Sequence, residues 1–153
     1  MYLAVVVLTM FLAPLGSVAA DGALHAQAPL MALVGKWFVF WGVGVRLGLA
    51  GVRQFIQPGF TARDIFHLSG DEALPLVREL GVANFAAGMV GLLSPARPSF
   101  VLPVAISAGI FYGVAGVQHV IDRPRTRNEA IAMVSDLFMA VVLATVAVSS
   151  WMA

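Results

Sequence analysis

Cysteine is absent from this chain, and charged residues are scarce. Only 11% of the 153 residues are charged, and nine basic residues nearly balance eight acidic ones. Without cysteine there are no disulfides, thiolate nucleophiles or cysteine-ligated zinc or iron–sulfur centres. A net charge of +1 without a dense basic face gives no nucleic-acid signature, so we expect no nucleic-acid partner. The charged fraction is also too small to cover the surface of a soluble domain.

Short enzyme motifs are missing as well. Gly42, Gly44 and Gly48 do not have the dinucleotide-binding spacing, and no GxSxG, HExxH or phosphate-loop sequence is present. The three histidines are too scattered to form a metal site. We therefore expect no catalytic residue, no metal and no cofactor. A non-enzymatic protein is favoured over an enzyme.

Long apolar blocks dominate the sequence. Hydrophobic residues make up 60% of the chain and fall in blocks of about 20, the length of helix that crosses about 30 Å of hydrocarbon. The prediction is an all-α integral membrane bundle forming one transmembrane domain over residues 1–153, with a short interfacial amphipathic helix. The first block ends in a small-residue stretch like a signal-peptide cleavage site, but without a basic n-region it is better read as a span. The five predicted spans cover about residues 2–20, 30–55, 74–93, 100–121 and 128–151.

Capping signals mark two further helix starts. Thr61 with Asp64 predicts the interfacial helix, and Thr126 with Glu129 predicts the start of the fifth span. Asn84 lies about 140° around its helix from Glu79, which favours a hydrogen bond between helices. Other polar and aromatic residues have simpler interpretations. We expect His25 and His67 to be solvated, Lys36 to extend toward the interface, and Trp37, Trp41 and Trp151 to form an interfacial belt.

The distribution of basic residues predicts an orientation. With five spans, Lys36 and Arg97 fall on one side, and Arg46 stays within the membrane. The other six arginines, including those of the 122–127 loop, fall on the opposite side. The positive-inside rule then puts the amino terminus in the cytoplasm, and we expect a prokaryotic inner membrane.

Ionisable residues inside the predicted spans form a candidate site. At about 1.5 Å per residue, Arg46 and Asp136 both lie about 10–12 Å from the cytoplasmic ends of their spans. An ionised residue at the centre of a helix costs about 2.5–3.5 kcal/mol on insertion scales, so we expect a bidentate Arg46–Asp136 pair with Glu79 as the other partner. Tyr112 and His119 fall at similar levels, and His119 could act as a proton switch.

Small residues mark where helices approach closely. Gly44 and Gly48 lie at GxxxG spacing on the second span, and Gly109 and Gly113 repeat it on the fourth. Another face of the second span carries six residues spaced three and four apart. They are Lys36, Val39, Val43, Arg46, Ala50 and Arg53.

Three hypotheses follow from these features. In the first, the charged cluster binds a lipid, quinone or other small-molecule ligand, or handles protons. In the second, the charges only lock the bundle of an accessory subunit, and the glycine faces meet a second copy or a larger membrane complex. The third is a membrane enzyme acting on lipid or quinone, for which no nucleophile or redox cofactor can be named. The lipid bilayer is a partner under all three.

Four blocks between residues 36 and 138 carry a family resemblance. KWFVFWGVGVRLGLAGVRQFIQPGFTARDIF, VRELGVANFAAGMVGLLS, GIFYGVAGVQHV and EAIAMVSDLF resemble an uncharacterised domain-of-unknown-function family of small prokaryotic multipass membrane proteins. In span number and polar placement the chain is also loosely similar to DoxX-type bundles. The resemblance implies no activity. The matching motif positions are Arg46, Gln54, Pro58, Thr61, Arg78, Glu79, Asn84, Tyr112, His119, Glu129, Ser135 and Asp136.

Overall fold

The computed structural model describes residues 2–123 and 126–152, and every regular element within them is helical. Five of these helices are long and apolar enough to cross a membrane, which confirms the predicted number and order of spans. Pro124 and Arg125, which belong to the predicted basic loop, lie outside the described residues. The five candidate spans are Tyr2–Leu24, Leu30–Ile56, Ala73–Leu92, Pro98–Asp122 and Arg127–Met152.

Two of the spans contain a wide π-helical turn. The first span consists of α1 (Tyr2–Val7), η1 (Leu8–Leu12) and α2 (Ala13–Leu24). Its π-turn ends two residues before Pro14, which has no backbone N–H to donate, so the continuous helix lacks one backbone hydrogen bond at this point. The second span likewise passes from helix to π-turn and back to helix. Its parts are α3 (Leu30–Phe38), η2 (Val39–Val45) and α4 (Arg46–Ile56).

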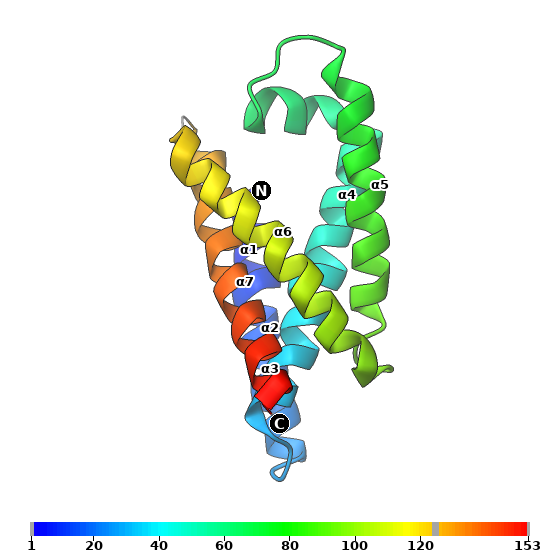
Figure 1. Cartoon of the computed structure of the whole chain (residues 1–153), viewed down its shortest axis with the longest axis vertical. Helices are drawn as coiled ribbons and strands as arrows, with labels where there is room; N and C mark the ends of the chain where they lie inside the picture. The colour runs from blue at the N-terminus through cyan, green and yellow to red at the C-terminus, as the bar shows by residue number, and fades with distance from the viewer. Residues whose placement is uncertain (1, 124–125, 153) are drawn as a thin grey trace.

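Glycines bring α4 close to α5 (Ala73–Leu92), so that the two helices lie side by side in Figure 1. A Cβ atom on Gly44 would lie 2.7 Å from the backbone N of Leu92. One on Gly88 would lie 2.5 Å from the Cα of Gly48. Any side chain here would push the backbones apart, so glycine is required by this approach.

A second helix pair is formed by α6 (Val101–Asp122) and α7 (Arg127–Met152), which pack along each other. Position 109 of α6 faces Leu143, and position 113 faces Ala140. Both glycine stripes singled out in the sequence therefore lie against helices of the same chain. The main core fills the space between α1, η2, α6 and α7, and its most deeply buried side chains include Met10, Val39, Val43, Met139, Leu143 and Val146.

The segment between α4 and α5 begins differently from the prediction. The π-helical turn η3 (Phe60–Ile65) is preceded by helical residues from Pro58 onward, so Thr61 is buried inside the helix and is not its N-cap. In Figure 1 this segment lies across one end of the molecule, between α5 and the end of α6. The other capping prediction is confirmed, because Thr126 and Glu129 exchange backbone and side-chain hydrogen bonds of 2.8 and 3.2 Å.

The outer faces of the spans are apolar. Large hydrophobic side chains are exposed along each of the five candidate spans, as expected where helices contact lipid. Leu12, Leu76, Ile110 and Val141 are each more than half exposed. The polar groups of the spans are thus placed mainly inside the bundle, where the candidate site lies.

Candidate functional site

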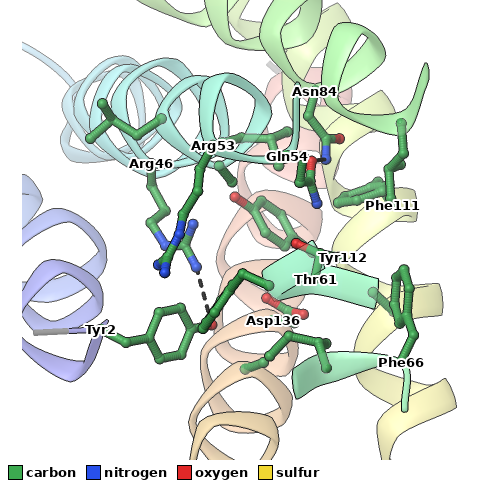
Figure 2. A pocket seen from close by; sticks show the side chains of 18 of the residues that line it. Tyr2, Arg46, Arg53, Gln54, Thr61, Phe66, Asn84, Phe111, Tyr112 and Asp136 are labelled. Carbon is green, nitrogen blue, oxygen red and sulfur yellow. Dashed lines mark hydrogen bonds between the residues drawn. The ribbon is translucent and has the colours of Figure 1, made fainter. Parts of the chain in front are cut away.

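A cavity of about 490 Å³ lies between the two helix pairs, a size in the range of small-molecule sites. Its walls come from α1, α4, η3, α5, α6 and α7, so residues distant in sequence meet there. Figure 2 shows the polar side chains converging on it. Those lining the cavity are Tyr2, Arg46, Arg53, Gln54, Gln57, Thr61, Asn84, Tyr112, His119 and Asp136.

Two arginines one heptad apart on α4 form one wall of the cavity. The Arg46 guanidinium lies 5.4 Å from the ring centre of Tyr2 and donates a 3.2 Å hydrogen bond to the Tyr2 hydroxyl. The Arg53 guanidinium lies 3.6 Å from the ring centre of Phe60. Each cation thus lies over the face of an aromatic ring, which attracts it electrostatically. The Nε atom of Arg46 is buried and has no hydrogen-bond partner among the described residues.

Asp136 faces the same cavity from α7. Among residues 2–123 and 126–152, its carboxylate forms no ion pair or hydrogen bond. The expected bidentate contact between Arg46 and Asp136 is therefore not made. The reason is geometric, because the two side chains project from different walls and the cavity lies between them. The long-range attraction between the opposite charges remains.

The other predicted site residues are placed in three different ways. Tyr112 lines the cavity but is buried, and its hydroxyl donates a 2.7 Å hydrogen bond to the Gly42 carbonyl of the π-turn η2. His119 lines the cavity from α6. Glu79 is exposed on α5 and is absent from the lining, because its side chain projects from a different face of the helix than Leu80 and Asn84. Glu79 is not a partner of Arg46.

Sequence reasoning missed part of the lining. Gln54 and Asn84 are joined by a 2.8 Å hydrogen bond across the α4–α5 contact, which confirms the predicted interhelical role of Asn84. Arg53 is predicted to lie on a polar helix face but is not among the predicted residues of the candidate site. Its spacing of seven from Arg46 could have indicated the site, because it puts both arginines on one side of α4. Phe66 and Phe111 line the apolar part of the cavity and are 45% and 36% exposed.

A latch formed by His67 and Glu129 lies beside the cavity. The His67 ring contacts the Glu129 carboxylate at 2.8 Å and joins the segment after η3 to the start of α7. His67 has a positive φ of 53°, a conformation that histidine adopts more readily than most residues. His67 is exposed, as expected, and it is in addition paired with Glu129. A smaller pocket of about 250 Å³ next to the latch shares His119 and Phe66 with the main cavity.

A second polar cluster lies at the opposite end of the second span. The buried Asp21 carboxylate accepts hydrogen bonds of 2.8 Å from Lys36 Nζ and 2.8 Å from Trp37 Nε1, and it contacts His25 Nδ1 at 2.7 Å. Lys36 therefore does not simply extend outward, and His25 is paired. Trp41 also turns inward and donates a 2.9 Å hydrogen bond to Ser17. Neither cluster brings three or more potential metal ligands together within residues 2–123 and 126–152.

The spans and the cavity define an integral membrane protein with a partly open chamber between its helices, lined by both apolar and polar side chains. The chain belongs to a family of unknown function, DUF6790, which matches residues 1–152. The comparisons found no match among curated proteins and none among solved structures.

Proposed function

We propose that this membrane protein binds a small ligand in the chamber between Arg46 and Asp136. The observation that carries the proposal is the separation of these opposite charges by the cavity. A structural clasp would bring them into contact, since burying two charges is favourable only when they pair closely. The buried Nε of Arg46 could be satisfied by an acceptor atom of such a ligand. Intramembrane ionisable residues commonly mark sites of this kind.

The accessory-subunit alternative receives less support. It assigned the glycine stripes to contacts with a second copy, but Gly44 and Gly48 face α5, and Gly109 and Gly113 face α7. Close helix approach within one chain already uses these surfaces. The bilayer remains a proposed partner, and the likeness to DoxX-type bundles remains a proposal resting on span number and polar placement.

Native mass spectrometry of the protein released from mild detergent tests ligand binding. We expect wild type to retain a bound mass that is lost in the double variant Arg46→Met with Asp136→Leu. Removing both charges together leaves neither unpaired, so the double variant should fold. The matched control is Arg78→Met with Glu79→Leu, which also removes one arginine and one carboxylate but changes two exposed residues outside the chamber. If the bound mass is missing from wild type, or survives in the charge-free double variant, the chamber is not a ligand site.

Proton handling is the second candidate function. Asp136 and His119 line the same chamber, and neither forms a hydrogen bond with another described residue. Liposomes loaded with a pH-sensitive dye should acidify faster with wild type than with Asp136→Asn. Equal rates for the two proteins, or a wild-type rate equal to that of empty liposomes, would exclude this function.

The amino-terminus-in orientation and the prokaryotic inner membrane are also proposed. Because the chain has no cysteine, single-cysteine variants can report the orientation directly. We expect an impermeant maleimide to label Ala26→Cys on intact cells and to label Ser69→Cys only after permeabilisation. Both positions are exposed in connections between spans, so the two variants control for each other. The reversed pattern would invert the proposed topology.

A further inference from the structure

Resting on the proposed ligand site, we infer the ligand's chemical class: a single-chain amphiphile with a carboxylate head, taken up sideways from the bilayer between α5 and α6. The head would lie against Arg46 and Arg53, and the chain would pass between Phe66 and Phe111. Three properties of the chamber lead to this assignment: its charge, the orientation of its cations, and the position of its apolar side.

The charge of the lining favours a monoanion. Arg46 and Arg53 contribute two positive charges, and Asp136 is the one carboxyl group of the lining. When Asp136 is ionised, one further negative charge balances this set, whereas a phosphate monoester would bring about −1.5 to −2. Guanidinium groups also bind carboxylates through two parallel N–H donors.

The arginines are held in a way that leaves donors available. Each guanidinium carbon lies over an aromatic ring, and a cation–π contact does not use up the N–H donors of the group. Arg46 donates one hydrogen bond to the Tyr2 hydroxyl, and its Nε has no partner among the described residues. Arg53 forms no hydrogen bond or ion pair with any described residue. The two side chains thus keep N–H groups for which no described residue is the acceptor, and one of them, Arg46 Nε, is buried.

The apolar side of the chamber lies opposite these cations. In Figure 2, Phe66 and Phe111 lie on the side of the cavity away from Arg46 and Tyr2. Both are partly exposed, and Phe111 lies in the middle of α6, where the surroundings are hydrocarbon. Helices α5 and α6 meet near their connecting turn and diverge from it in Figure 1. An apolar chain that leaves the head site by this route therefore enters the bilayer core.

Four probes separate the parts of this inference: palmitate, hexadecyl phosphate, hexadecanol and acetate, each titrated onto delipidated protein by native mass spectrometry. We expect palmitate to bind best, hexadecanol to bind at least tenfold more weakly, and acetate not to compete. Arg46→Met and Arg53→Met should each weaken palmitate binding at least tenfold. Arg78→Met, which removes an exposed arginine outside the chamber, should change the affinity for palmitate less than twofold.

The lateral route has its own test. A bulky maleimide on Phe111→Cys should slow palmitate binding at least tenfold. The same label on Ile110→Cys, which is exposed on α6 but does not line the cavity, should leave the rate unchanged. Equal slowing by both labels, or by neither, would overturn lateral uptake.

The outcomes distinguish this inference from the broader proposal. If wild type carries a bound mass that depends on Arg46 and Asp136 but palmitate does not displace it, the ligand site stands and the carboxylate amphiphile is wrong. Tighter binding of hexadecyl phosphate or hexadecanol, or competition by acetate, would likewise overturn the assigned class alone. Absence of any bound mass together with absence of probe binding would remove both.

Discussion

Two pairs of opposite charges in this bundle are arranged in contrasting ways. Lys36 and Asp21 touch at 2.8 Å, and Asp21 is further held by Trp37 and His25. Arg46 and Asp136 share a cavity without contact. Each pair has one member on the second span and one on another span. The first pair has the geometry of a clasp, whereas the second leaves room for the proposed ligand.

The difference shows that a charge inside a helical bundle is not evidence of one role. A carboxylate with three donors around it is satisfied by its own chain, and its loss leaves those donors unpaired. A carboxylate that faces a cavity contributes an electric field to whatever enters that cavity. Stability measurements and binding measurements should therefore respond oppositely at the two pairs.

The largest loss of stability is expected for Asp21→Leu. This change leaves Lys36 and the indole N–H of Trp37 without their acceptor, so two hydrogen bonds that join the first and second spans are lost. The free energy of unfolding in mixed micelles is the measurement. Ligand binding in the folded fraction should be unchanged, because the cluster lies at the other end of the second span. An unfolding free energy equal to that of wild type would remove the clasp interpretation.

A smaller effect is expected for His67→Gln at the latch. The His67 side chain is 31% exposed, so its contact with Glu129 contributes about 0.5–1 kcal/mol. Opening the latch should also speed maleimide labelling of Ala115→Cys, which lines both pockets. His25→Gln is the matched control, because it removes the other carboxylate-paired histidine far from the chamber. Equal labelling rates in the two variants would show that the latch does not restrict access.

The smallest effect on stability is expected for Asp136→Leu. No hydrogen bond or ion pair is lost, so the free energy of unfolding should change by less than about 0.5 kcal/mol. Removing the negative charge should at the same time strengthen binding of the palmitate probe by about fivefold, since repulsion of roughly 1 kcal/mol is relieved. A stability loss of about 3–5 kcal/mol would instead show that Arg46 and Asp136 form a dry pair.

Features set by local sequence could be predicted well. Span lengths follow from the number of apolar residues, and the capping box of Thr126 and Glu129 depends on residues three apart. The interhelical bond of Asn84 was predictable because a buried amide needs a partner. These arguments require only distances along one helix.

Features that depend on three-dimensional placement could not be predicted. Whether Arg46 touches Asp136 or faces it across a cavity depends on how far apart α4 and α7 pack, and no local pattern encodes that distance. Glu79 was misplaced because depth in the membrane does not specify direction around the helix. The first span is predicted to end at about residue 20, whereas α2 continues to Leu24 and includes the buried Asp21.

The π-turn η2 (Val39–Val45) has a consequence for how this span could change. A π-turn closes i to i+5 hydrogen bonds and so contains residues beyond those of a regular helix. Deleting Val45 would allow ordinary helical winding and shift the angular phase between Lys36 and Arg46 by about 100°. If the Asp21–Lys36 contact held the first half of the span in its present orientation, Arg46 and Arg53 would rotate together away from the cavity. A one-residue deletion could thus abolish binding while every charged side chain remained in the protein.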